Sequence, residues 1–349
     1  MLSTGAGGRA PVTAIAAQTR RMPLLLADRA ATRAPLPLIT SAEARALRLP
    51  VSGAACTRVR RGVYADAAAA ARLTPWARYA LRVHAFAVTH PGTMLCLESA
   101  AVLHGLPLFG EARDIHVFDA ERTSSRRFGD VCVHTSSDPR ESVERAGIPV
   151  TSLLDTVVDL CRVLPPAQAL AVADAAISPA QGGTLDLDRL RERSADQVSR
   201  RGVARLAWTW ARADGLAESP GESVSRAVIR WCGFEDPVLQ PVFGYEGVDD
   251  RVDFLFPSAR ALGESDGWGK YDLHDAARAE QHLRNEKRRE DRLRRAGHPF
   301  ARWDLADAVR VDPLATALQR ADVPLVRTRD RGGLATLGRS PRTLASRPR

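Results

Sequence analysis

The sequence predicts a mixed α/β fold (α+β) built from three folded parts in series. Short stretches of alternating apolar and polar residues, typical of strands, interleave with longer stretches that carry apolar residues at helical spacing. A hydrophobic fraction of 45% in 349 residues is ordinary for a globular protein of two or three domains. Changes in composition divide the chain into a flexible tail at 1–36, a small segment at 37–70, a middle α/β domain at 71–212, a C-terminal domain at 213–319 and a basic disordered tail at 320–349.

The net charge of +9 is concentrated at the two ends of the chain. Residues 1–33 hold five Arg and one Asp, and residues 320–349 hold eight Arg and two Asp, which leaves the residues between them near neutrality. Arginine-rich ends favour polyanions, and each neutralised phosphate adds about −0.9 to the salt slope of duplex DNA binding. DNA is therefore the predicted partner, and the alternative is that these ends bind nothing specific.

Cysteine usage and hydropathy indicate the compartment. The sequence has no C-x-x-C pair and no apolar run of about 18 residues, so we expect no zinc site and no membrane span. Reduced thiols in a cytoplasmic protein are the simplest interpretation of five scattered cysteines: Cys56, Cys96, Cys132, Cys161 and Cys232.

The segment at 37–70 predicts two short helices followed by a strand and a wing. Thr40 and Glu43 have capping-box spacing at the start of a helix over Thr40–Arg48. A second helix is expected at Ser52–Arg58, and the strand and wing at Val59–Asp66. Three arginines here are candidates for phosphate contacts, which position a protein on DNA without reading its sequence: Arg58, Arg60 and Arg61. A protein-contact module is the alternative.

The middle domain is expected to contain helices and two strands. Helical spacing covers Trp76–Thr89, Leu97–Leu103, Pro149–Arg162, Ala167–Ile177 and Leu187–Arg212, and the strands are Asp114–Phe118 and Val131–Thr135. The loop between the strands carries a second set of arginines, which either contact phosphate or are merely solvated: Arg122, Arg126 and Arg127.

The C-terminal domain is expected to open with a capped helix. Ser219 is the predicted N-cap, Pro220 the first helical residue, and Gly233 the stop after Trp231. Glu222 lies at the third helical position, where capping alone explains it and a metal-site role is the alternative. A strand at Val238–Phe243 follows.

The next hairpin brings carboxylates together. Arg251–Phe256 and Ala261–Ser265 are the predicted strands. A loop at Pro257–Arg260 would place Asp253 opposite Glu264, with Cβ atoms about 5 Å apart. A loop one residue longer or shorter would put them on opposite faces.

Asp266 shares a face with Glu264, and Lys270 follows within reach. Clustered carboxylates repel unless a cation lies between them, and their hard oxygen ligands suit Mg²⁺, with Mn²⁺ as a substitute. Solvent-facing charges on an edge hairpin are the alternative interpretation.

A long basic helix is predicted at Asp275–Arg295, before a last strand at His298–Trp303 and a last helix at Asp304–Gln319. Between Arg278 and Arg295 it holds eight basic and four acidic residues, so it either faces water or offers cations to a phosphate backbone. The candidate contacts are Arg288, Arg289 and Arg292.

The order of several motifs resembles a large actinobacterial family. These motifs are ESPGES at Glu218–Ser223, RVDFLFP, GESDGWGKY, EKRREDRLRRAG at Glu286–Gly297, and ARWDLADA. The C-terminal domain of that family resembles the very-short-patch-repair (Vsr) branch of the PD-(D/E)XK nuclease fold, with a central mixed sheet. Its N-terminal part resembles the winged-helix region of AbiEi-type antitoxins. The resemblance implies metal binding by Asp253 and Glu264, with Glu222 as a third ligand.

Two positions depart from the pattern of that family. Asp266 stands where a lysine is usual, and Gly263 stands where an aliphatic residue is expected. Lys270 is the nearest substitute for the lysine.

The sequence therefore predicts a DNA-binding protein with a Mg²⁺-dependent, Vsr-like endonuclease centre. Asp253 and Glu264 would bind the metal, Glu222 or Asp266 would complete its shell, Lys270 would orient water, and Arg289 would contact the backbone. The alternative is an AbiEi-like transcriptional regulator or antitoxin, with an inert nuclease-like domain and a nucleotidyltransferase-like toxin as partner.

Overall fold

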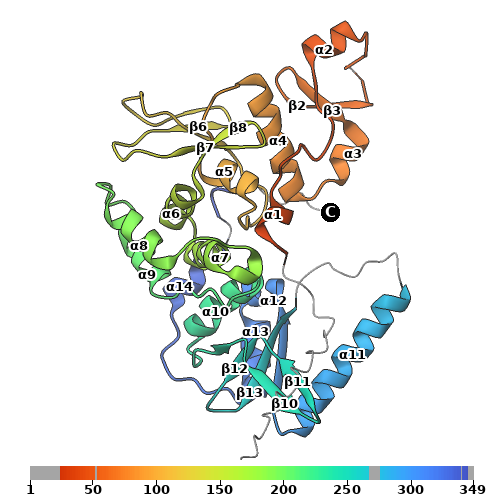
Figure 1. Ribbon diagram of the computed structural model, residues 1–349, viewed down its shortest axis with the longest axis vertical. Coiled ribbons are helices and arrows are strands. Elements are labelled where there is room, and N and C mark those ends of the chain that lie inside the picture. Colours follow the sequence, from red (N-terminus) through yellow and green to blue (C-terminus); the bar gives the residue numbers. More distant parts are fainter. Residues whose placement is uncertain (1–23, 52, 267–275, 339, 345–349) are drawn as a thin grey trace, which may run out of the picture.

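The computed structural model describes residues 24–51, 53–266, 276–338 and 340–344. It confirms the mixed α/β class: helices alternate with several small sheets, two of which combine parallel and antiparallel pairs. Figure 1 shows an elongated molecule with the N-terminal hairpins at one end, a helical centre, and a sheet-containing C-terminal domain at the other end.

The N-terminal part forms a three-stranded sheet with the order β1-β3-β2. Its elements are α1 (Leu26–Arg29), β1 (Ile39–Thr40), α2 (Ser41–Ala46), β2 (Cys56–Arg60), β3 (Val63–Asp66) and α3 (Ala67–Arg72). Thr40 and Glu43 form the predicted capping box of α2. The predicted helix at Ser52–Arg58 is wrong, because residues 56–60 contain the β-branched Thr57 and Val59 and pair with β3.

Part of the predicted N-terminal tail is also ordered. Leu26 in α1 is buried, and so is Ala31. The ideal Cβ position of Gly105, which ends α5 (Leu97–His104) with φ +76°, lies 1.9 Å from the Leu26 carbonyl oxygen. A side chain at Gly105 would collide with α1, so the prediction of a flexible tail fails for residues 24–36.

The middle domain contains most of the predicted elements. They are α4 (Pro75–Thr89), α5, β4 (Ile115–Phe118), β5 (Arg126–Phe128), β6 (Val131–His134), β7 (Ser142–Arg145), β8 (Ile148–Thr151), α6 (Leu153–Val163), α7 (Pro166–Ile177), α8 (Leu187–Ala195) and α9 (Val203–Trp210). The helix predicted from Pro149 begins four residues later, because residues 148–151 pair with β7 and Ser152 caps α6.

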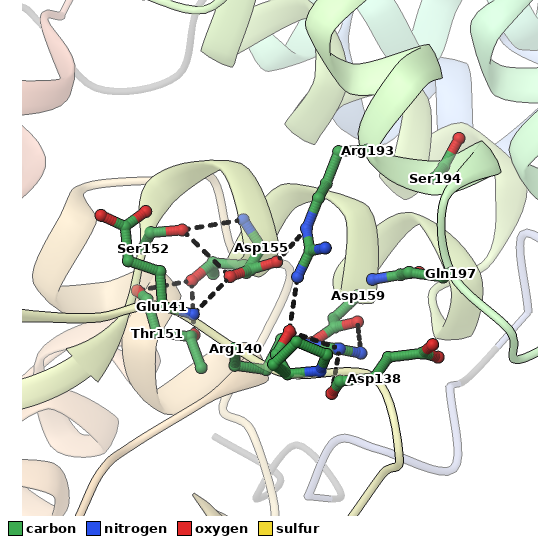
Figure 2. A network of polar contacts seen from close by, with 12 residues as sticks. Asp138, Arg140, Glu141, Thr151, Ser152, Asp155, Asp159, Arg193, Ser194 and Gln197 are labelled. Atoms are coloured by element: carbon green, nitrogen blue, oxygen red, sulfur yellow. Dashed lines mark hydrogen bonds and ion pairs between the residues drawn. The ribbon is translucent and has the colours of Figure 1, made fainter.

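Ion pairs fix α8 and the chain before β7 to α6. The Arg140 guanidinium binds both Asp159 oxygens at 2.7 and 2.8 Å, and Arg193 Nε lies 2.7 Å from Asp155 Oδ1 (Figure 2). Asp138 accepts hydrogen bonds from the backbone N–H groups of Val198 and Ser199. These contacts explain the buried acidic residues of this region structurally.

The C-terminal domain is built on a four-stranded mixed sheet with the order β14-β13-β12-β9. Its elements are α10 (Pro220–Cys232), β9 (Val238–Leu239), β10 (Val242–Tyr245), β11 (Val248–Arg251), β12 (Phe254–Phe256), β13 (Ala261–Asp266), α11 (Ala276–Arg295), β14 (Phe300–Asp304), α12 (Leu305–Arg310) and α13 (Asp312–Arg320). β12 and β13 are antiparallel, and β13 and β14 are parallel. The single helix predicted after β14 is divided at Val311, which has φ 72°.

The prediction of a disordered tail at 320–349 is wrong for the described residues 320–338 and 340–344. Val323 is buried, and α14 (Arg331–Ala335) lies against α10, where the Asp330 N–H donates to the Trp231 carbonyl. Arg342 reaches the middle domain and forms a bidentate ion pair with buried Glu98. Burial would raise the pKa of Glu98, but His116 and Arg342 lower it to about 2. Arginines of this tail therefore act as internal counter-ions.

Gly263 in β13 has a packing explanation. The Trp303 ring from β14 stacks on Phe254, with ring centroids 5.6 Å apart. A Cβ atom at Gly263 would lie 2.7 Å from Trp303 Cη2 and 3.2 Å from Phe256 Cε2. The aliphatic residue expected here is replaced by glycine because the buried indole occupies its space.

We expect Gly263→Ala to destabilise the protein by about 1–3 kcal/mol, since overpacking a filled core forces neighbouring side chains from their positions. Urea unfolding measures the change. Gly332→Ala is the matched control, because its nearest contact would be an ordinary 3.4 Å from Asp330 Oδ1. Equal stabilities of the two variants would show that the indole does not require glycine.

Candidate functional site in the C-terminal domain

The hairpin of β12 and β13 has the register on which the predicted site depends. Phe254 pairs with Gly263 and Phe256 with Ala261, so the loop is Pro257–Arg260 as predicted. The predicted strand Arg251–Phe256 is divided, since Arg251 ends β11 and β12 begins at Phe254. Asp253 therefore lies directly before the ladder, and its place opposite Glu264 stays a prediction.

Glu264 is buried and bound by two arginines. Arg289 Nη2 from α11 contacts Glu264 Oε1, and Arg302 Nη2 from β14 lies 3.0 Å from Oε2. Arg289 is fixed further by its Nη1, which donates to the Arg251 carbonyl at 3.0 Å. Burial raises the pKa of Glu264, and the two guanidinium groups offset that shift by stabilising the carboxylate. The positive charge opposite Glu264 is thus supplied by the protein.

The other carboxylates of the hairpin have separate contacts. Asp253 Oδ2 accepts a 3.0 Å hydrogen bond from the Ser265 backbone N–H. Asp266 Oδ2 lies 3.5 Å from Arg302 Nε. Lys270, the predicted lysine of the site, lies outside the described residues.

Glu222 lies in the first turn of α10, which begins at Pro220. Ser219 is the N-cap as predicted, and its Oγ accepts from the Glu222 N–H at 3.2 Å. Glu222 Oε2 accepts two hydrogen bonds, from the Glu218 N–H at 2.9 Å and from Gln240 Nε2 at 3.0 Å. The side chain is 4% exposed, and burial raises its pKa to about 7. Glu222 therefore titrates near neutral pH.

Glu222 and Glu264 approach the sheet from opposite faces. A Cβ on Gly221 in α10 would lie 3.0 Å from Ser265 Oγ, so Ser265 points toward α10. Consecutive strand residues point to opposite faces, so Glu264 points away from α10 and toward α11. Among the described residues, no group of three His, Cys, Asp or Glu side chains could hold a metal ion. The described residues thus do not bring Glu222 and Glu264 together as the resemblance implies, and Mg²⁺ binding stays a prediction.

Six of the nine arginines predicted as candidate phosphate contacts, those of the segment at 37–70 and of α11, divide into two groups. Arg60 pairs with Asp130 at 2.6 Å, Arg292 binds both oxygens of buried Asp250 at 2.7 and 2.8 Å, and Arg289 binds Glu264. These three serve internal ion pairs. The other three are exposed: Arg58, Arg61 and Arg288.

Arg302 is the residue of the site that sequence reasoning missed. It alternates with buried Ala301 and Trp303 in β14, so its position toward the other face follows from strand periodicity. Its pairing with Glu264 depends on β14 lying parallel to β13, which no local pattern encodes.

Comparison with known proteins gives two similar sequences. The uncharacterised proteins MT2308 and Rv2248, from two strains of Mycobacterium tuberculosis, are each 32% identical to this chain over 171 residues. The match covers 48% of this chain and 60% of each mycobacterial protein. No family model matches the sequence. No solved structure matches it either.

In the described part of the chain, none of the helices combines the length and the apolar character that crossing a bilayer requires.

Glu222→Gln should remove a pH-dependent cost of folding. The folded-state pKa near 7 exceeds the unfolded value of roughly 4.3, so wild-type stability falls as pH rises through this window, by up to roughly 4 kcal/mol. Glutamine keeps one oxygen for both hydrogen bonds without the charge. Urea unfolding at pH 5 and pH 8 should show the variant gaining stability over wild type at the higher pH. The exposed Glu192→Gln control should show no such gain, and a constant difference between Glu222→Gln and wild type would refute the assignment.

Proposed function

We propose that this protein binds duplex DNA through two arginine-bearing hairpins of its N-terminal half. The observation that carries the proposal is the connection between them. Asp130, directly before β6, accepts Arg60 from β2 at 2.6 Å and Arg82 from α4 at 3.3 Å. This bridge connects the β2–β3 hairpin to the β5–β6 hairpin. It also offsets the positive charge of Arg60, which lies where the two hairpins meet.

The remaining arginines of the two hairpins face solvent. Arg58 and Arg61 are exposed on the first hairpin, and Arg126 and Arg127 on the edge strand β5 of the second. Arg127 also lies 2.8 Å from Asp114, which orients it. Exposed guanidinium groups on rigid strands suit phosphate contacts that fix position on a duplex. The absence of a helix at 53–58 favours backbone binding over base reading in the major groove.

In this proposal the C-terminal domain is an inert, nuclease-like scaffold, as in the AbiEi-like regulator interpretation. The pairing of Glu264 with Arg289 and Arg302 supports it, because two guanidinium groups bind the carboxylate that a metal ion would need as a ligand. A cognate nucleotidyltransferase-like toxin belongs to the same proposal.

Arg58→Gln/Arg61→Gln should weaken duplex binding and flatten its salt dependence. The loss of two phosphate contacts makes the slope of log K against log salt less negative by about 1.8. Fluorescence anisotropy of a labelled duplex over a range of salt concentrations measures both. The double variant Arg189→Gln/Arg200→Gln removes the same charge from other exposed positions and should leave the slope unchanged. Equal slopes for all three proteins would reject the hairpins as the interface.

A second candidate function is Mg²⁺-dependent phosphodiester hydrolysis at the carboxylate centre. The buried Nε–H of Arg289, whose guanidinium binds Glu264, has no hydrogen-bond partner among the described residues. Buried donors are nearly always satisfied, so this one favours an anion such as a phosphate beside Glu264. The carboxylate pattern, which resembles that of Vsr-like nucleases, also supports this second function.

Calorimetry with Mg²⁺ and Mn²⁺, together with plasmid nicking, decides between the two functions. The scaffold proposal expects wild type, Asp253→Ala and Glu264→Ala to show neither metal binding nor nicking. Metal binding and nicking by wild type that both variants lose would establish the endonuclease. Circular dichroism of each variant verifies that the substituted chains remain folded.

A further inference from the structure

A pocket of about 330 Å³ lies between the middle and C-terminal domains, away from both sites described above. It is formed by α7, the chain after α9, α10 and the residues before β9. Figure 1 shows α7 and α10 next to each other near the middle of the molecule. Its charged lining consists of three arginines and two aspartates: Arg212, Arg226, Arg230, Asp214 and Asp236.

Most of these charges already have partners. Arg226 pairs with buried Asp174 at 2.9 Å. Asp236 is shared by Arg230 at 2.6 Å and by Arg327, from the C-terminal tail, at 2.9 Å. One carboxylate thus serves two guanidinium groups at the rim. With Asp214 counted, the lining holds three arginines against two aspartates, an excess of one positive charge.

Arg212 carries that excess. Its guanidinium stacks on the Trp208 ring at 4.7 Å, and its Nη1 donates to the Trp208 carbonyl at 2.9 Å. Among the described residues no carboxylate forms an ion pair with it, and its buried Nε has no hydrogen-bond partner. Burial and the neighbouring Arg230 lower the pKa of Arg212. Holding a cation in this position costs free energy that a bound anion would recover.

Arg212, Trp208 and Trp231 form a rigid stack. A fixed guanidinium group is better suited to binding an anion than a freely moving surface arginine. Trp208 also stacks on Trp231 of α10, with centroids 5.5 Å apart, so the indole under Arg212 is anchored to both domains. Arg226 Nη2 donates to the Arg212 carbonyl at 2.6 Å and fixes the backbone. The guanidinium is therefore preorganised, and a ligand pays little to order it.

We propose that this pocket binds a phosphate group, with Arg212 as its principal ligand and Arg230 in support. A tetrahedral dianion matches an excess guanidinium charge, and guanidinium groups bind phosphate by parallel N–H···O bonds. The phosphate belongs either to a small phosphorylated molecule or to a nucleic-acid backbone. The site does not depend on the hairpins or on the carboxylate centre.

Titration calorimetry of the full-length protein with inorganic phosphate and with a short DNA duplex tests the pocket. Arg212→Gln should raise the Kd about tenfold for the phosphate source that uses the site, the loss expected for one charged hydrogen bond. Arg212→Lys keeps the charge and should retain part of the affinity. Thermal unfolding verifies that both variants are folded.

Two controls make the outcome specific. Arg189→Gln removes an equal charge from exposed α8 and should not change either Kd. Arg58→Gln/Arg61→Gln should leave binding of inorganic phosphate unchanged. Failure of the hairpin proposal can therefore be told apart from failure of the pocket proposal. An effect of Arg212→Gln on free phosphate supports a small-molecule site, and an effect on the duplex alone supports a backbone contact. Unchanged affinity for both ligands in Arg212→Gln would overturn the proposal.

Discussion

The arrangement of the two larger domains depends on a buried ion pair between α7 and α10. Asp174 is fully buried, and Arg226 Nη1 lies 2.9 Å from its Oδ2 while the Asp214 N–H donates to Oδ1 at 2.8 Å. Burial raises the pKa of Asp174 to about 6, and Arg226 opposes that rise. Breaking such a pair from one side costs about 3–5 kcal/mol, so the pair specifies one docking geometry strongly.

Helix α7 supplies the apolar part of the same constraint. Leu170 and Ala171 pack with Val228 of α10, whereas Val172 and Ala176 pack with α6 and α9. Helix α7 thus contributes side chains to two hydrophobic cores, one on each side of it. The division at residue 212 marks a change in sequence composition, but the core is continuous across it. The arginine-lined pocket lies at this junction, so its shape is set by the interdomain packing.

Sequence patterns predicted the elements whose causes are local. The capping of α2 by Thr40, the start of α10 at Ser219 and the four-residue hairpin loop depend on neighbouring residues, and all three are confirmed. The failures have nonlocal causes. Cys56–Arg60 is a strand because β3 pairs with it, and Arg289 is an internal counter-ion because β13 and α11 bring Glu264 beside it. An arginine-rich stretch has the same composition whether its charges meet solvent or buried carboxylates.

The contact of Arg342 with Glu98 links residues 244 positions apart in the chain. Ala112 also forms a β-bridge with Thr343, so the tail completes both the charge balance and the backbone pairing of the middle domain. During synthesis from the N-terminus, Glu98 would be buried long before its partner leaves the ribosome. Contacts this distant in sequence slow folding. The middle domain therefore reaches its full charge balance and backbone pairing only once Arg342 and Thr343 have docked on it.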